Sequence, residues 1–469
     1  PPPPPPPPPP TPPHTPPPTR PPRPRPTTPP PPPPPRPPPP RPPPTPPAAP
    51  PATTPRPGAA TATTAGGSAT TEAAAEGCDE PIRIGVLQPL TGGLAASGTD
   101  AKDGFELYWA NHSTEIAGCT VEFRVEDTGG NPDTALQKVD ELVQNYGAEI
   151  IVGELLANVT FALADRLKDN EDVIFMSPIG SADDMTQRNP FPNFIRAGGW
   201  TSSQTSHVLG QWAHDQGFSN VASMCTDYAF GWEMCGGFTQ VFTEAGGTVA
   251  PASQLWNPLG STDLGTYVTQ LSGVDPDAVF VLQVGASVSD FFQNWSDFGL
   301  KEEIPILAGE VTADVSNIRN VPVEQVEGLI SSGHWAEGRD APETQEFVEL
   351  FDGATGRLPS YYAAATWTAA QYIDETIQAL NGDLSDKGAA LETMKGLELL
   401  TPFGPSVLDD YGNPIYDIYI REVVVRDDGR IWNVVIDTYE DVDQFWPKTA
   451  EEYLQQPVYS REFQGNAGG

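Results

Sequence analysis

The sequence predicts an α/β protein of two lobes, each built round a parallel β-sheet, preceded by a disordered proline-rich segment. Two observations predict this. The chain has 469 residues, and most of its 57 prolines stand before residue 58, which leaves roughly 390 residues from Cys78 onward, more than one core usually organises. From residue 82, apolar runs typical of buried strands alternate with helical patterns, first in one series and then in a second.

The first 77 residues form a segment of their own. Residues 1–57 are nearly all proline with threonine and arginine, a composition that favours extended polyproline II, and residues 58–77 are typical of a flexible linker. Such a segment could thread a cell wall. The same run could also arise from GC-rich upstream DNA translated in error, so two interpretations stay open.

The first strand and helix series occupies residues 82–178. Ile82–Leu87 is a buried-strand run, and the helix expected at 99–111 places Phe105, Tyr108 and Trp109 on one apolar side. The elements that follow are strand 121–125, helix 133–146, strand 149–152, helix 159–168 and strand 173–176. This order is the βαβ pattern of a parallel sheet.

The second series begins after Gly198. Its expected elements are helix 203–216, strand 220–224, helix 232–245, a short strand 248–250, helix 263–271, strand 278–282, helix 288–298 and strand 305–307. Helices 342–353 and 363–380 and strands 416–425 and 431–436 follow and must be shared between the lobes. We assign residues 78–199 with about 330–402 to lobe 1, residues 200–329 with about 403–460 to lobe 2, and 461–469 to a tail.

The charge argues against a nucleic-acid partner, and the hydropathy argues against a membrane-spanning helix. The net charge is −37, and no cluster of lysine and arginine follows Cys78, so nucleic acid is not expected as a partner. No apolar run reaches the ~18 residues that a membrane-spanning helix needs.

The four cysteines predict two disulfides in an oxidising compartment, Cys78 with Cys119 and Cys225 with Cys235. The first pair precedes two strands that would lie side by side, and the second pair would close a short loop; free buried thiols are the alternative. Cys78 is also a candidate lipid-attachment site, although Glu76 argues against that reading. No cysteine or histidine spacing predicts a metal site.

Several ordered motifs across residues 82–440 resemble one family. They are Ile82-Arg83-Ile84-Gly85-Val86-Leu87-Gln88-Pro89-Leu90-Thr91-Gly92; Asp127 with Gly130-Asn131-Pro132; Phe175-Met176-Ser177-Pro178; Thr186-Gln187-Arg188; and Phe403-Gly404-Pro405 with Asp410 and Gly412-Asn413-Pro414. Their order is similar to that of the Leu/Ile/Val-binding family of periplasmic solute-binding proteins. The resemblance implies two Rossmann-like lobes joined by three crossovers, the type 1 periplasmic-binding-protein fold, with a ligand held between the lobes.

Two loops are expected to hold a ligand carboxylate. Ala157 and Asn158 end the loop between strand 149–152 and the helix that follows it, where free backbone N–H groups stabilise an anion. The resemblance places Gly180 and Ser181 at the family's carboxylate-binding positions, although by spacing alone Ser181 is an ordinary helix N-cap.

The resemblance also indicates the rest of the site. Glu310 matches the family's acceptor of a ligand ammonium, while a lone loop glutamate is more often a solvated charge. Phe230 keeps a family aromatic beside Tyr228, whereas Ser97 and Val284 stand where family members often have aromatic residues. The side-chain pocket is therefore expected to differ, and polar amino acids, amides and aromatic acids all remain candidate ligands.

These features predict a solute-binding protein outside the cytoplasm that captures an amino acid or related small carboxylate for a membrane ABC permease. It is expected to be a monomer without cofactor. No dinucleotide, phosphate-loop or nucleophile-elbow motif predicts an enzyme, and His334 is read as a packing residue. A ligand-binding sensory module and a wall-associated binding protein of the same fold are the alternatives.

Overall fold

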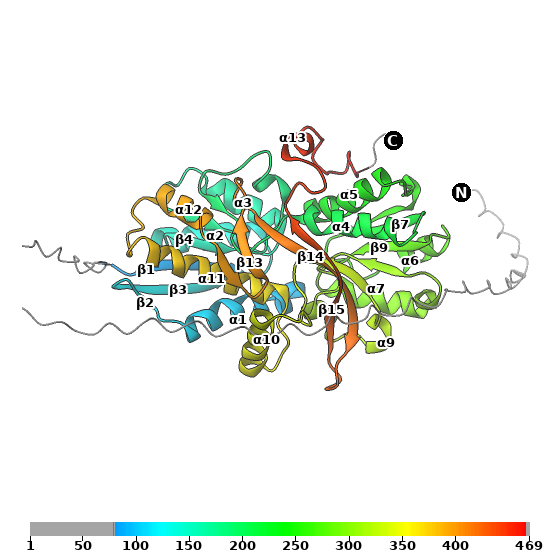
Figure 1. Cartoon of the computed structure of the whole chain (residues 1–469), viewed down its shortest axis with the longest axis horizontal. Helices are drawn as coiled ribbons and strands as arrows, with labels where there is room; N and C mark the ends of the chain where they lie inside the picture. The colour runs from blue at the N-terminus through cyan, green and yellow to red at the C-terminus, as the bar shows by residue number, and fades with distance from the viewer. Residues whose placement is uncertain (1–77, 79, 466–469) are drawn as a thin grey trace, which may run out of the picture. The chain divides into compact units, whose positions relative to one another are not determined.

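A computed structural model describes residue 78 and residues 80–465 of the chain. The predictions made for residues 1–77, and for residues 466–469 of the tail, lie outside the described residues. The described part contains two β-sheets with helices packed on them, one sheet in each lobe (Figure 1).

Lobe 1 contains a six-stranded sheet in the order β2-β3-β1-β4-β5-β6. All its pairs are parallel except β2 with β3. Its strands are β1 (Ile82–Gln88), β2 (Glu115–Ile116), β3 (Cys119–Asp127), β4 (Ile150–Gly153), β5 (Ile174–Met176) and β6 (Phe194–Ile195). Its helices are α1 (Ala95–Asn111), α2 (Pro132–Glu141) with a π turn at Leu142–Tyr146, α3 (Ala157–Leu167), α10 (Pro342–Thr355), α11 (Tyr361–Ala379) and α12 (Lys387–Lys395).

Lobe 2 contains a nine-stranded sheet in the order β12-β13-β14-β11-β10-β9-β7-β8, with β15 paired to β14. The strands β8, β7, β9, β10 and β11 are parallel, and β14 runs antiparallel to β11. The strands are β7 (Val221–Asp227), β8 (Gln254–Pro258), β9 (Ala278–Leu282), β10 (Ile306–Ala308), β11 (Ile330–Gly333), β12 (Leu399–Thr401), β13 (Gly404–Leu408), β14 (Pro414–Val425) and β15 (Ile431–Val442). The helices are α4 (Ser202–Asp215), α5 (Ala229–Glu244), α6 (Gly265–Ser272), α7 (Ala286–Asp297), α8 (Val315–Ile318), α9 (Val323–Val326) and α13 (Ala450–Tyr453).

The chain passes between the lobes three times, as expected: after β6, after β11, and along β13 and β14. Helix α11 packs along α1 in lobe 1, and Figure 1 shows β14 and β15 as a long pair between the two groups of helices. The residue ranges assigned above to each lobe stay a prediction.

One predicted strand is wrong. Residues 248–250 form no strand; Thr248 makes a single bridge to Asn220, and the strand lies later, at β8. A 3-10 turn that begins at Pro251 intervenes, because proline fixes the backbone angle φ and lacks the N–H that a ladder needs.

Both predicted disulfides are present. Cys78 pairs with Cys119 with their Cα atoms 4.8 Å apart, and Cys225 pairs with Cys235 at 6.5 Å. The first follows from the parallel pairing of β1 with β3, which aligns Ile82 with Val121. Within the described residues, no helix is both long and apolar enough to cross a membrane.

Candidate functional site

The candidate site lies between the lobes, where the carboxyl ends of β1, β4 and β5 face those of β7, β9 and β10. The lobes contact each other there. The hydroxyls of Ser97 on α1 and Ser316 on α8 are 2.9 Å apart, and the N–H of Asp183 donates to Glu233 on α5 at 3.1 Å. Arg319, which follows α8, forms an ion pair with the buried Asp100 on α1. The structure therefore holds the lobes together around this region.

The first turn of α3 offers backbone donors. Its N-cap residue is Leu156, which provides no side-chain oxygen, so the N–H groups of Ala157 and Asn158 receive no cap. Ala157 is buried, whereas the side chain of Asn158 is exposed. Only the backbone of Asn158 is therefore suited to contact a ligand held between the lobes.

Glu154 was not singled out from the sequence, yet it lies at the start of this turn. Its carboxylate accepts from the Thr128 hydroxyl at 2.5 Å and from the Leu156 N–H at 2.7 Å. Burial raises the pKa of Glu154 to about 7. The sequence gives no signal for this role, because a glutamate after a strand looks the same whether its side chain is buried or solvated.

The loop after β5 contains Gly180 and Ser181. A Cβ atom on Gly180 would lie 2.0 Å from the Thr160 hydroxyl oxygen, so only glycine fits there. Arg196, fully buried, donates to the carbonyl oxygens of Gly180 at 2.6 Å and Ala182 at 2.7 Å. These two hydrogen bonds fix the loop.

The hydroxyl of Ser181 already has a partner. It lies 3.0 Å from the Ser202 hydroxyl oxygen at the start of α4, and the Ser181 carbonyl accepts from the Ser202 N–H at 2.8 Å. A hydroxyl has one donor and two acceptor sites, so Ser181 retains capacity for a further hydrogen bond.

Glu310 follows β10 and is fully buried, with its charge balanced inside the protein. Its Oε2 lies 2.9 Å from His334 Nδ1, and its Oε1 accepts from the His334 N–H at 3.1 Å. Arg421, also fully buried, places Nη1 3.6 Å from the same Oε1. His334, which the sequence suggested as a packing residue, therefore also contacts the Glu310 carboxylate.

Six aromatic side chains meet between the lobes, and we call them the interlobe aromatic cluster. Trp200 contacts Phe230 at 5.8 Å, Tyr361 at 5.9 Å and His334 at 5.3 Å between ring centroids. The cluster consists of Trp200, Tyr228, Phe230, His334, Tyr361 and Tyr362. Of these, only Phe230 with Tyr228 was expected.

The cluster contains polar atoms without partners. In the part of the chain that the structure describes, Trp200 Nε1 and His334 Nε2 are buried and form no hydrogen bond, and the same holds for both amide atoms of Gln88 at the end of β1. Burial also raises the pKa of Tyr228 and of Tyr361 well above the usual range, which keeps both phenols protonated. Buried polar atoms are normally satisfied, so these atoms are available to a bound molecule.

Ser97 and Val284 stand on opposite sides of this region. Ser97 is buried against Ser316, and Val284, also buried, lies in the loop after β9, where its carbonyl accepts from the Ser287 hydroxyl at 2.8 Å. Ser97, Ser181, Phe230, Val284 and Glu310 all lie in loops or first helical turns that follow the parallel strands β1, β5, β7, β9 and β10.

Comparisons with known proteins agree with this arrangement. The model of the periplasmic binding protein family matches residues 81–430. Leu/Ile/Val-binding protein homolog 6 of Brucella abortus is 28% identical over 368 residues, which cover 76% of this chain and 92% of the relative.

Two solved structures share the fold. An ABC transporter substrate-binding protein from Sphaerobacter thermophilus is 28% identical with a TM-score of 0.72, over 78% of this chain and 99% of that one. A solute binding protein of an ABC transporter from Rhodopseudomonas palustris BisB5, in complex with 3,4-dihydroxybenzoic acid, is similar in fold at 23% identity with a TM-score of 0.73, over 78% of this chain and 98% of that one. The chain described here belongs to the periplasmic binding protein family.

Proposed function

We propose that this protein binds a small aromatic carboxylate between its lobes and delivers it to the membrane permease of an ABC importer. It acts as a monomer outside the cytoplasm and performs no chemistry on its ligand. Membership of the periplasmic binding protein family supports this role, and the two disulfides support an oxidising compartment.

The uncapped first turn of α3 supports the carboxylate part of the proposal. Its N–H groups at Ala157 and Asn158 have no side-chain cap, and the positive end of the helix dipole favours an anion there. Ser181 adds a hydroxyl on the neighbouring loop, which Arg196 fixes through the carbonyls of Gly180 and Ala182. These groups suit the oxygens of one carboxylate.

The interlobe aromatic cluster supports a ring as the body of the ligand, and this is the observation on which the proposal chiefly depends. Aromatic faces and edges pack favourably against another ring. The unpartnered Trp200 Nε1 of the cluster could bond a hydroxyl substituent of that ring. The Rhodopseudomonas protein of the same fold was solved with such an acid.

An amino acid is the second candidate, favoured by the name of the Brucella relative. In that case Glu310 would accept the ammonium, as the sequence suggested. Its carboxylate already accepts from His334 and lies beside Arg421, so an ammonium would have to compete with a buried cation. We therefore place the aromatic carboxylate first.

Thermal shift and calorimetry on the full chain test the choice. The ligands are benzoate, 4-hydroxybenzoate, benzamide as the uncharged analogue, leucine and phenylalanine. A ligand at about 100 times its dissociation constant adds about 2.7 kcal/mol of stability. A shift with the benzoates but not with benzamide supports the proposal. A shift with leucine alone would replace it with the amino-acid function, and silence across all five would reject both.

A further inference from the structure

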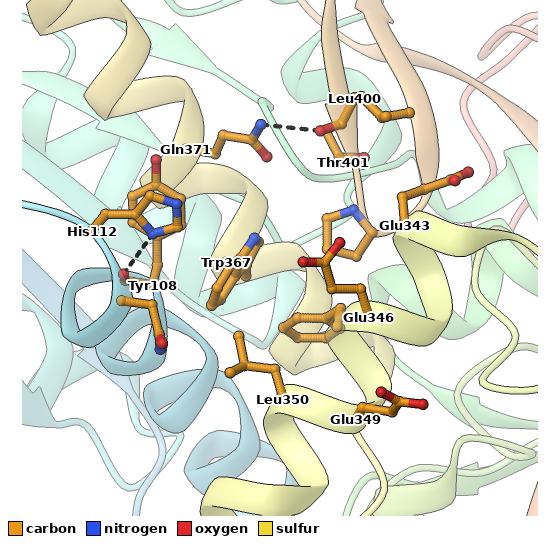
Figure 2. Close-up of a pocket in the computed structure, with 13 residues that line it drawn as sticks. Tyr108, His112, Glu343, Glu346, Glu349, Leu350, Trp367, Gln371, Leu400 and Thr401 are labelled. Atoms are coloured by element: carbon orange, nitrogen blue, oxygen red, sulfur yellow. Dashed lines mark hydrogen bonds between the residues drawn. The ribbon is translucent and has the colours of Figure 1, made fainter.

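A second concave site lies where strand β12 of the nine-stranded sheet meets the helices of lobe 1. It is a groove of about 710 Å³ between the end of α1, helices α10 and α11, and strand β12 (Figure 2). We call it the α10 groove and define it by Tyr108, His112, Glu346, Phe347, Glu349 and Trp367. These residues belong to helix faces and not to the carboxyl ends of the sheet strands, so the α10 groove is separate from the site proposed above.

The floor of the α10 groove is aromatic. The ring of the half-buried Trp367 is roughly perpendicular to those of Tyr108 at 5.1 Å and His112 at 5.6 Å, and it contacts Phe347 at 5.2 Å between ring centroids. Tyr108 is fixed in turn, because its hydroxyl donates to Asp374 at 2.7 Å and its ring stacks on His112. Trp367 is therefore a firmly held aromatic surface at the bottom of a hollow.

The wall of the α10 groove is acidic. Glu343, Glu346 and Glu349 follow each other at intervals of three along α10, which places them on one side of the helix. Glu343 pairs with Arg339 at 2.8 Å. Among the described residues, Glu346 and Glu349 have no ion pair or hydrogen bond, and both are exposed. Figure 2 shows Trp367 between His112, which follows α1, and Glu346 on α10.

Apolar side chains complete the α10 groove. Leu350 lies beside Trp367, and Leu400 on β12 leaves 61% of its surface exposed, more than other large apolar residues of the described part. No group of histidine, cysteine, aspartate and glutamate in the described residues is arranged to hold a metal ion. The lining thus combines an aromatic face, unpaired carboxylates and aliphatic surface.

We propose that the α10 groove binds an organic cation of the quaternary or alkylated ammonium class. Such a cation is attracted by the face of a tryptophan ring, and its methyl groups are apolar enough to lie against leucine. The carboxylates of Glu346 and Glu349 supply charge complementarity, and a bound cation would relieve their mutual repulsion along the helix. A hard metal ion would gain little from Trp367, which explains the preference for an organic cation.

Choline is the probe, and its uncharged isostere 3,3-dimethyl-1-butanol is the matched control ligand. The chain has ten tryptophans, so the readout is the indole N–H resonance of Trp367 in the full chain, assigned by its loss in Trp367→Phe. Choline is expected to shift this resonance in a saturable way, and the alcohol is expected to shift it much less. Equal responses to both ligands, or no shift with choline, would overturn the proposal.

Two double variants test whether the acidic side chains of α10 contribute to choline binding. The double variant Glu346→Gln/Glu349→Gln is expected to weaken choline binding at least about fivefold, in the range that charge and cation–π contacts supply. The matched control is Glu324→Gln/Glu327→Gln, two exposed glutamates at the same spacing around α9 in lobe 2. If both double variants weakened binding equally, the effect would come from the general acidity of the chain, and the specific site would be rejected.

The test is independent of the carboxylate site. Glu346→Gln/Glu349→Gln is expected to leave the thermal shift with benzoates unchanged, because both side chains are exposed on α10 and belong neither to the first turn of α3 nor to the interlobe aromatic cluster. If choline instead shifted the Trp200 resonance and its binding survived the α10 variants, the cation would occupy the interlobe region, and the α10 groove would be rejected without affecting the fold or the transport role.

Discussion

The carboxylate of Glu310 and the imidazole of His334 form a fully buried contact, with Oε2 and Nδ1 2.9 Å apart. Arg421 lies near the other carboxylate oxygen of Glu310, Oε1, and donates hydrogen bonds to the carbonyl oxygens of Trp335 and Glu310. The three side chains join β10, β11 and β14 in the middle of the lobe 2 sheet, next to the interlobe aromatic cluster. A residue that the sequence suggests as a ligand contact is thus also part of the internal charge balance of lobe 2.

Glu310→Gln is therefore expected to lower the free energy of unfolding by about 3 kcal/mol, because it leaves the buried Arg421 without its counter-charge. Urea unfolding measures the loss. The exposed Glu324→Gln is the control and is expected to change stability by less than about 0.5 kcal/mol. A loss of ligand binding without a loss of stability would instead indicate that Glu310 acts mainly on the ligand.

Ser181→Ala is expected to weaken carboxylate binding by about 1–2 kcal/mol, the value of a charge-assisted hydrogen bond. Isothermal titration calorimetry with the best benzoate measures it. Asn158→Ala is a useful companion, because the exposed side chain can be removed while the backbone N–H stays, and binding should be unchanged. Unchanged binding in Ser181→Ala would remove its hydroxyl from the site.

The stability of the fold should depend on pH through Glu154. Burial raises its pKa from 4.5 to about 7, so in this window the folded protein holds a proton that the unfolded chain releases. Its contribution to stability is therefore present below pH 4.5 and is lost as the pH rises toward 7, on the order of 3 kcal/mol in total.

Glu154→Gln removes this titration. Relative to the wild type, the variant is expected to gain stability as the pH is raised from 5 to 8, measured by urea unfolding at each pH. A difference between variant and wild type that stays constant over this range would show that Glu154 is ionised throughout. The exposed Glu171→Gln serves as the control variant.

The two disulfides are expected to contribute unequally. They close loops of 41 and 10 residues, and in the chain-entropy account the longer loop contributes about 4 kcal/mol and the shorter about 3 kcal/mol. Thermal unfolding of Cys78→Ser/Cys119→Ser and of Cys225→Ser/Cys235→Ser measures the order. The reverse order would indicate that strain or packing near Cys225 outweighs loop entropy.

The C-terminal segment after β15 should depend on Arg188. This side chain, 17% exposed, donates to the carbonyls of Tyr453 at 3.2 Å and Gln456 at 3.1 Å and pairs with Asp184. Arg188→Ala is expected to cost about 2 kcal/mol and to speed proteolysis within 443–465, because hydrogen bonds from a charged group are lost. Arg166→Ala, which removes an exposed pair with Asp140, should cost under about 1 kcal/mol.

Local patterns predicted most elements well. The strand at Ala278–Leu282 was expected with the bounds that the structure shows, because five consecutive apolar residues in a fully buried parallel strand give an unambiguous signal. Strand β8 was missed because its edge position leaves it polar, with Gln254 and Asn257 in place of an apolar run. Short strands such as β2 and β6 were missed because two residues show no period.

The sequence by itself determined the two-lobed α/β fold, both disulfides and the loops at the ends of strands, because these depend on periodicity and on the spacing of nearby residues. Only the tertiary structure decided what those loops contact. Glu310 meets His334 and Arg421 from positions 24 and 111 residues away, and Trp200 meets Phe230 and Tyr361 from three separate segments. Burial and pairing of this kind are long-range properties, and they set whether a carboxylate or an aromatic ring is internal support or a contact for a ligand.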